Sequence, residues 1–284
     1  MNANEMTFGV EFEVCLPLAN LIAVGGYHNG LPVFGLPAGW NAQRDASIQP
    51  PAGFYGVEIV SPVLRGEDGL RQVVAVCKWL KSLRARVNGS TGMHVHVGFA
   101  GQTSKRIGML VGLMAFHEVA FYSVTGTKAR ELANYARPIK ADESFKAVAA
   151  QNGTVRGTQR YRSLNLNNLG HGKNTVEFRT FAGTTNYIKA VGYIRMCLAL
   201  VERCLLLKRQ PRWDAKKPVE TAYFGKMGEG KAAFMRFCYY VGWLKGNYPT
   251  PLGCVVGAGV PGMDTTRRQL CKMAEKYDVP ASAR

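Results

Sequence analysis

The chain has 284 residues, 47% of them apolar, and a formal net charge of +17. This length and apolar share exclude a wholly disordered chain and suffice for one large domain, or for a domain with a subdomain. The excess of 36 Lys and Arg over 19 Asp and Glu favours anionic partners such as nucleic acids, nucleotides or acidic substrates, although a generally basic solvated surface has the same composition.

The first half of the chain alternates between strand-like and helical patterns. Strand-like patterns occupy three stretches, which are residues 6–16 ("MTFGVEFEVCL"), 55–64 and 93–99. Helical periodicity predicts helices at residues 67–87 and 103–124. The Gly- and Pro-rich residues 17–54 predict a long irregular excursion, and excursions of this length are often functional.

The second half begins with the polar and basic residues 128–158, whose patterns are mixed. Two strands, at residues 162–169 and 174–181, are joined by "GHGK" and predict a β-hairpin. A helix is expected at residues 185–208. Strands that recur with helices between them predict an α+β protein, and the lack of regular βαβ alternation argues against a doubly wound fold.

The cysteines, the N-terminal residues and the apolar stretches indicate in which cell compartment the protein is expected. The seven Cys form no CxxC pair, which predicts reduced, buried thiols rather than a disulfide framework. The N-terminal "MNANEMTFG" lacks the pattern of a secretory signal, and charged residues interrupt the long apolar stretches. We therefore expect a cytoplasmic protein that has no membrane partner.

Two carboxylates stand inside the first apolar strand. Alternate residues of a strand point to opposite faces, so Glu11 and Glu13 share one face and Phe12 lies on the other. Carboxylates at this spacing repel each other unless a positive charge lies between them. The same pattern also occurs where one face of a strand is exposed to solvent, so the pair alone does not distinguish a cation site from an exposed face.

Other strands repeat this habit of one apolar and one polar face. The polar residues are His94 and His96, Asn165 and Asn167, Glu177 and Arg179, and the single Glu58. Taken alone, each pattern has an ordinary explanation as an exposed pair or a surface ion pair. Their coincidence favours neighbouring strands whose polar faces converge into one cavity.

This set of residue types indicates phosphoryl transfer. Several carboxylates with a histidine suit hard divalent cations such as Mg²⁺ or Mn²⁺, whereas a structural Zn²⁺ site would use more Cys and His. An arginine beside such ions is the natural partner of a phosphate oxygen. Carboxylates, Mg²⁺ and Arg together are the components of phosphoryl transfer from ATP.

The ordered motifs resemble those of the amidoligases, relatives of glutamine synthetase and glutamate–cysteine ligase. The motifs are "GVEFEV", "RDASI" with "GVEIVSPVL", "GMHVHVG", "RYRSLNLNNL" and "VEFRTFAGTTN". The resemblance implies a curved, mainly antiparallel sheet, whose concave face is the active site and whose other face carries helices, as in the catalytic domain of glutamine synthetase. It implies a catalytic domain over residues 1–208. We expect residues 209–284 to form a basic, partly helical extension packed on the same domain.

The resemblance also implies roles for individual residues. The implied metal ligands are Glu11, Glu13, Glu58, His94 and Glu177. Arg179 is implied to contact the transferred phosphate, as a catalytic and ATP-binding residue, and His96 is a second catalytic candidate. Asn165 and Asn167 are expected to bind the cofactor, which is ATP with Mg²⁺ or Mn²⁺. Asp45 lies in a matching segment, but its loop does not place it.

The activity implied is that of an ATP-dependent carboxylate–amine ligase, which forms an amide (isopeptide-like) bond through an acyl phosphate. Its partners would be a small-molecule or peptide carboxylate and an amine. The alternative is a metal-dependent protein that binds nucleic acid or processes phosphodiesters with the same carboxylates.

Three basic stretches are compatible with a nucleic-acid partner. They lie at residues 128–140, 156–162 and 208–217, with Tyr135, Tyr161 and Trp213 interleaved. A solvated basic face, or one that attracts ATP and an acidic substrate, also explains them.

Overall fold

The computed structural model describes residues 5–139, 160–169, 172–208, 227–244 and 259–280. The strands are β1 (Thr7–Pro17), β2 (Leu31–Pro32), β3 (Asn41–Gln43), β4 (Phe54–Val60), β5 (Leu64–Arg65), β6 (Gly92–Gly98), β7 (Leu164–Asn165) and β8 (Thr175–Ala182). The helices are α1 (Gly66–Ser82), α2 (Ser104–Ser123), α4 (Tyr187–Leu206), α6 (Glu229–Tyr240) and α7 (Met263–Tyr277), with a 3₁₀ helix η1 (Asn167–Leu169).

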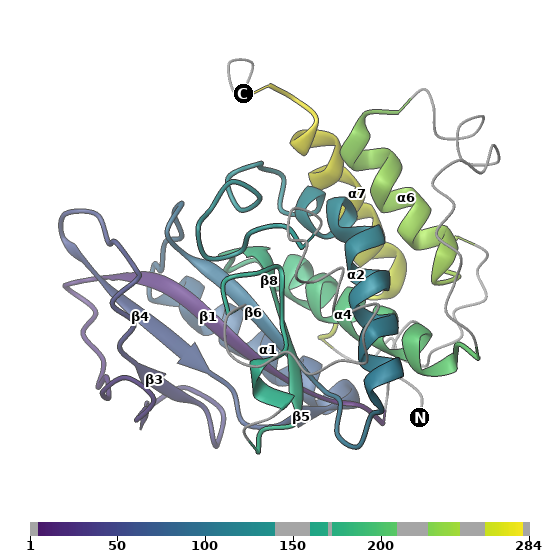
Figure 1. Ribbon diagram of the computed structural model, residues 1–284. Coiled ribbons are helices and arrows are strands. Elements are labelled where there is room, and N and C mark those ends of the chain that lie inside the picture. The colour runs from purple at the N-terminus through teal and green to yellow at the C-terminus, as the bar shows by residue number, and fades with distance from the viewer. Residues whose placement is uncertain (1–4, 140–159, 170–171, 209–226, 245–258, 281–284) are drawn as a thin grey trace.

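The described strands form one eight-stranded sheet in the order β2-β3-β4-β1-β6-β8-β7, and β5 pairs with β1 beside this path. All pairs between named strands are antiparallel. In Figure 1, β4, β1 and β6 run side by side, with α2, α4, α6 and α7 gathered beyond them. The predicted α+β class with a mainly antiparallel sheet is confirmed.

One face of the sheet carries the helices because the strands place alternate apolar residues there. In β1 the buried residues of this face are Phe8, Val10, Phe12 and Val14. Phe178 of β8 stacks on Phe121 of α2 with ring centroids 5.7 Å apart, and Phe181 stacks on Tyr193 of α4 at 4.2 Å. Burial of such side chains contributes roughly 1.5–3 kcal/mol each. This packing leaves the opposite face of the sheet to the polar residues.

The described C-terminal helices pack in the same helical layer. Helix α6 contacts α2, helix α7 contacts α4, and the two helices contact each other. The Asp278 carboxylate accepts hydrogen bonds from the Gly230 and Lys231 N–H groups at the start of α6, at 2.7 and 3.1 Å. The rest of the expected extension, at 209–226, 245–258 and 281–284, lies outside the described residues. None of the described helices has the length and apolarity to cross a membrane.

Two expectations need correction. The excursion at 17–54 is not wholly irregular, since it contains the short strands β2 and β3. The strand expected at 162–169 is only two residues long: the Asn165 side chain accepts the Asn167 N–H at 3.0 Å, and the chain turns into η1. The hairpin pairing is confirmed, because Asn165 pairs with Glu177. Residues 170–171 of its link lie outside the described residues.

Candidate active site

The polar face of the sheet brings residues of several strands into direct register. These cross-strand pairs are Glu11 with His94, Glu13 with Glu58, and His96 with Glu177. Directly opposite residues have Cβ atoms roughly 4.5–5.5 Å apart, so their side chains meet. The expected convergence of polar faces is therefore present, and we call these six residues the cluster.

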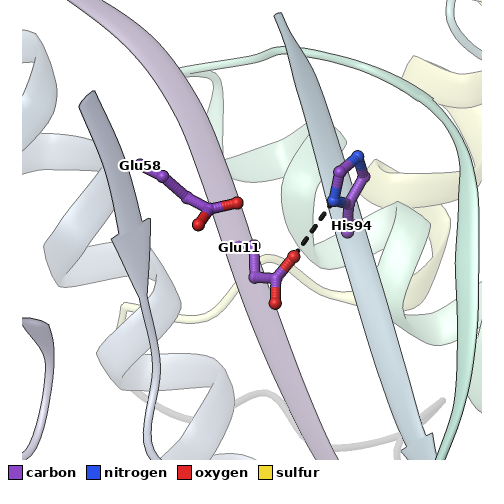
Figure 2. A group of neighbouring side chains, drawn as sticks. All are labelled: Glu11, Glu58 and His94. Carbon is purple, nitrogen blue, oxygen red and sulfur yellow. Dashed lines mark hydrogen bonds and ion pairs between the residues drawn. The ribbon is translucent and has the colours of Figure 1, made fainter. Parts of the chain in front are cut away.

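Glu11 lies at the centre of the cluster. One of its oxygens, Oε2, lies 3.0 Å from His94 Nδ1, and the other, Oε1, lies 3.1 Å from His96 Nε2. His94 Nδ1 is also 3.6 Å from Glu177 Oε1. Figure 2 shows Glu11 between Glu58 on one neighbouring strand and His94 on the other. A single carboxylate thus joins ligands from three strands.

Glu13 and Glu58 form the second half of the cluster. Glu13 accepts the Gly92 N–H at 2.5 Å, and its other oxygen lies 3.4 Å from His94 Nε2. Glu58 accepts a hydrogen bond from the Gln43 side chain at 2.5 Å. Both carboxylates are buried. Each is therefore held by one neutral donor, and neither has a Lys or Arg in ion-pair contact among the described residues.

Among the described residues, three groups of side chains have ligand atoms close enough to hold a cation, within 4.8 Å of one another in each group. The groups are Glu11, Glu58 and His94; Glu11, His96 and Glu177; and Glu13, Asp45 and Glu58. Glu11 and Glu58 each belong to two groups, so the groups are continuous. Carboxylate-rich donor sets with one imidazole suit Mg²⁺ or Mn²⁺.

The electrostatics of Glu58 fit a cation at this place. Burial raises the pKa of Glu58 to about 8, and the negative charges of Glu11, Glu13 and Asp45 add to the effect, while the Gln43 hydrogen bond opposes it. Ionised Glu58 therefore lacks compensating positive charge. A divalent cation shared by these carboxylates would supply it.

The other half of the cluster is better compensated. Burial tends to raise the pKa of Glu11, but attraction to His96 and hydrogen bonds from His94 and His96 outweigh it and hold the pKa well below its usual value. Burial likewise acts to raise the pKa of Glu177, and the charges of Arg179, His96 and His94 together outweigh it and lower that pKa. Burial acts to lower the pKa of His96, but the attraction and hydrogen bond of Glu11, together with the charge of Glu177, outweigh it and raise that pKa. A bound cation would replace this imidazole proton.

Arg179 lies at the edge of the cluster, on a β-bulge. The register of β6 with β8 shifts between Met93 and Val95, so both Arg179 and Thr180 stand opposite His94. The Arg179 guanidinium bonds to Glu177, and its Nε donates to the Tyr135 carbonyl at 3.1 Å. Bulges often re-aim side chains beside active sites. This one sets a guanidinium next to the proposed ion ligands.

Arg130 is a second cation at the site that the sequence motifs did not reveal. It is buried, and its Nη2 donates to the Arg179 carbonyl at 2.9 Å. A Cβ added at Gly92 would lie 2.8 Å from Arg130 Nη2 and 3.1 Å from His94 Nε2. Gly92 therefore leaves the space in which this guanidinium approaches the cluster. Burial lowers the pKa of Arg130, and the charge of Glu13 opposes that shift.

The asparagines occupy different places. Asn165 reaches the cluster, since its side-chain NH₂ donates to Glu177 at 2.6 Å. Asn167 lies in η1, and its Oδ1 is buried without a hydrogen-bond partner among the described residues. The next residue, Asn168, instead lies 3.5 Å from His96 Nδ1. The two asparagines expected to act together are therefore separated by the turn into η1.

Gln43 and Asp45 also lie at the cluster, and the sequence motifs gave neither of them a role. They come from β3 and the residues after it, inside the excursion expected to be irregular. Gln43 pairs with Glu58 across the strands, and Asp45 also accepts the Ser47 N–H at 2.7 Å. Their alternate spacing, the same as that of Glu11 and Glu13, was the signal that could have found them.

A pocket of about 770 Å³ extends from Glu11 and His96 toward the start of β1 and the end of β6, where Leu205 of α4 also lines it. Glu11 and His96 line one end, and Gly9 and Gly98 contribute further along the same strands. The remaining lining includes Val60, Pro62, Val63, Lys173, Asn174 and Thr175. A Cβ at Gly9 would lie 3.5 Å from Ser61 Oγ and 3.9 Å from His96 Cβ, so a larger side chain there would enter the pocket.

Comparison with known proteins gives the family. A family model described as "Putative amidoligase enzyme" matches residues 34–149 and 143–201, more than half of the chain. The chain belongs to this amidoligase family. No curated protein matches the sequence. A search of solved structures found similarity to a bifunctional glutathione synthetase from Pasteurella multocida, with a TM-score of 0.46 and 9% identity over 97% of this chain. The chain spans 52% of that protein.

The family model matches only part of the cluster, and the strand pairing of the amidoligase completes it. The matched residues include Glu58, His94, His96 and Glu177. Glu11 and Glu13 precede the matched residues in the sequence. The pairing of β1 with β4 and β6 nevertheless places them in the middle of the cluster. The cluster is therefore complete only with the first strand.

Proposed function

We propose that this amidoligase is an ATP-dependent carboxylate–amine ligase, which forms an amide (isopeptide-like) bond through an acyl phosphate. The observation that carries the proposal is the set of ion-binding groups centred on Glu11 and Glu58, with Arg179 beside it. Family membership supports the ligase class, ATP and the divalent cation are our inference from the ligand types, and the acyl phosphate is our inference from the resemblance to carboxylate–amine ligases.

In the proposed reaction a substrate carboxylate oxygen attacks the γ-phosphorus of ATP, and ADP leaves. An amine nitrogen then attacks the acyl carbon, phosphate leaves, and the nitrogen loses a proton. Mg²⁺ bound by the cluster would offset the charge of the phosphates. Arg179 donates to the transferred phosphoryl group, and His96 contacts the phosphate or the substrate. With the ion bound, the cluster residues would position these groups for attack, and no covalent enzyme intermediate is needed.

The pocket that ends at Glu11 and His96 supports a location for the nucleotide. A pocket of about 770 Å³ is in the range of small-molecule sites. It starts at the proposed ion ligands, so a nucleotide in it would direct its phosphates to them. Lys173 lies on the lining, where its ammonium would favour an anionic ligand.

An assay of ADP release tests the function. The protein is incubated with ATP, Mg²⁺, and pooled carboxylates and amines. We expect ADP release that requires both co-substrates and falls by at least about a thousandfold in Glu177→Ala, because several kcal/mol of charge stabilisation would be lost. Asp68→Ala, which removes an exposed carboxylate on α1, is the matched control. Phosphodiester cleavage without any need for ATP would contradict the ligase proposal and support the alternative.

Gly9→Val tests the location of the nucleotide. Valine suits a strand, and the new side chain would occupy the pocket. We expect the KM for ATP to rise by about tenfold or more, with a Tm close to that of the unsubstituted protein. Gly89→Val, at a turn where an added Cβ meets no atom within 4 Å, is the control. An unchanged KM for ATP in Gly9→Val would place the nucleotide elsewhere.

A further inference from the structure

A continuous row of side chains lies beside the cluster. We call Tyr27, Tyr135, Arg137, Arg160 and Tyr161 the rim. Arg160 donates to the Tyr27 hydroxyl at 2.7 Å and lies 5.6 Å from the Tyr161 ring centroid. Tyr161 in turn meets Tyr135 edge-on at 5.4 Å. Arg137 joins the rim through its backbone, whose N–H donates to the Tyr161 carbonyl at 2.8 Å, and its guanidinium donates to the Asn134 side chain at 2.7 Å.

The rim joins the two edges of the sheet over its polar face. Tyr27 follows Gly25, which pairs with Gln43 at the end of β3. Arg160 precedes β7 at the other end of the strand order. The Arg179 guanidinium, which bonds to Glu177, also donates to the Tyr135 carbonyl. A ligand on the rim would therefore lie at the mouth of the cluster.

The rim is cationic and aromatic. Tyr27, Tyr135 and Tyr161 are 51%, 46% and 46% exposed, although large aromatic side chains gain from burial. Arg137 and Arg160 are exposed, and no carboxylate of the described residues lies within ion-pair distance of either. The whole chain adds a formal net charge of +17. Exposed rings beside guanidinium groups without a carboxylate partner among the described residues are the two components of a surface for single strands of nucleic acid.

We infer that the rim binds single-stranded nucleic acid, with the arginines on phosphates and the tyrosine rings on bases. An acidic peptide would be attracted by the arginines, but it would make no use of three exposed rings. A duplex would offer phosphates and keep its bases stacked internally. This binding goes beyond the ligase activity, and it requires neither ATP nor a divalent cation.

The test is fluorescence anisotropy with a labelled single-stranded oligothymidylate, without ATP or Mg²⁺, at several salt concentrations. We expect affinity to fall steeply with salt. Tyr161→Ala and Tyr135→Ala should each lower affinity by roughly 5- to 100-fold, because stacking on one ring contributes about that factor. Arg160→Gln should reduce the logarithmic salt slope by about one. Tyr161→Leu, which keeps apolar bulk but removes the ring, should behave like the alanine variant.

Two controls lie in the helical layer, away from the rim. Tyr239→Ala removes a ring that is 54% exposed, and Lys272→Gln removes an exposed charge of α7. Thermal unfolding shows that each variant is folded. The inference is overturned if the controls weaken binding as much as the rim variants, or if a duplex of the same length binds as tightly. It is also overturned if poly-glutamate competes equally and the tyrosine variants bind normally, since the partner would then be an acidic peptide.

Discussion

Glu11→Ala is expected to abolish both ATP-dependent turnover and the stabilisation of the protein by Mg²⁺. Glu11 belongs to two of the three groups of candidate ion ligands among the described residues, and its two oxygens meet different imidazoles, those of His94 and His96. No neighbouring carboxylate can replace it in both groups. Its loss therefore removes a shared ligand and leaves the two histidines without their common acceptor.

The effect should be large in two independent measurements. Mg²⁺ at about one hundred times its Kd stabilises a protein by about 2.7 kcal/mol, which corresponds to a rise in Tm of roughly 5–10 °C for a chain of this size. We expect this rise in the unsubstituted protein and none in Glu11→Ala. Turnover should fall by at least about a thousandfold. The same loss of thermal response is expected for Glu13→Ala.

The control is again Asp68→Ala, whose carboxylate is 86% exposed on α1. It removes the same charge from the chain, and its Tm should still rise with Mg²⁺. Glu11→Gln separates charge from shape, because the amide keeps the volume of the side chain but has only one acceptor oxygen. A normal Mg²⁺ response in Glu11→Ala would show that Glu11 is not an ion ligand.

The polar face of the sheet could be predicted because strand alternation depends on local sequence alone. Glu11 and Glu13 share a face whatever strand lies beside them, and the same holds for His94 and His96. The elements themselves also follow local patterns, so β1, β6 and α2 lie within a residue or two of their expected bounds. The coincidence of several such strands predicted a shared cavity, and the resemblance supplied the roles of the residues in it.

The register between strands could not be predicted in this way. A slip by one residue would move His94 away from Glu11 and to the other face, and nothing local to "GMHVHVG" excludes it. The bulge that brings Arg179 and Thr180 opposite His94 depends on the packing of Phe178 and Phe181 in the helical layer. Both features arise from contacts between distant segments.

Residues supplied by loops were also beyond local patterns. Arg130 reaches the cluster from turns after α2, and its place depends on the space above Gly92. The position of Asp45 depends on the pairing of β3 with β4, which covers only three residues of each strand. Asn167 was expected in a strand beside Asn165. Its N–H instead donates to the Asn165 side chain, and the strand ends there. Such placements follow from tertiary contacts that spacing in the sequence does not encode.

The stability of the metal-free protein should fall as pH rises from about 6.5 to about 8, because of Glu58. Below pH 6.5 the buried His117 acts in the opposite direction, because burial lowers its pKa to about 3 and unfolding lets it bind a proton. The folded-state pKa of Glu58, about 8, lies above the ordinary value of 4.5. A group with a raised folded pKa contributes stability that is fully present below the unfolded pKa and is lost as pH rises through the folded one. His96, whose pKa is also raised, acts in the same direction. The loss should amount to a few kcal/mol, or a fall in Tm of roughly 5–10 °C.

Mg²⁺ should reverse this trend, because a cation bound to ionised Glu58 displaces its proton and binds more tightly as pH rises. The increase in Tm with Mg²⁺ is therefore expected to be larger at pH 8 than at pH 6. Glu58→Gln should raise the metal-free Tm at pH 8, since the neutral amide never ionises, and should remove most of the Mg²⁺ effect. Glu229→Gln, whose carboxylate is 66% exposed on α6, should change neither. Thermal unfolding across this pH range, with Mg²⁺ or with EDTA, measures both effects. A metal-free Tm that rises between pH 6.5 and pH 8 would mean that Glu58 is already neutralised by groups of the protein, and that no cation is needed there.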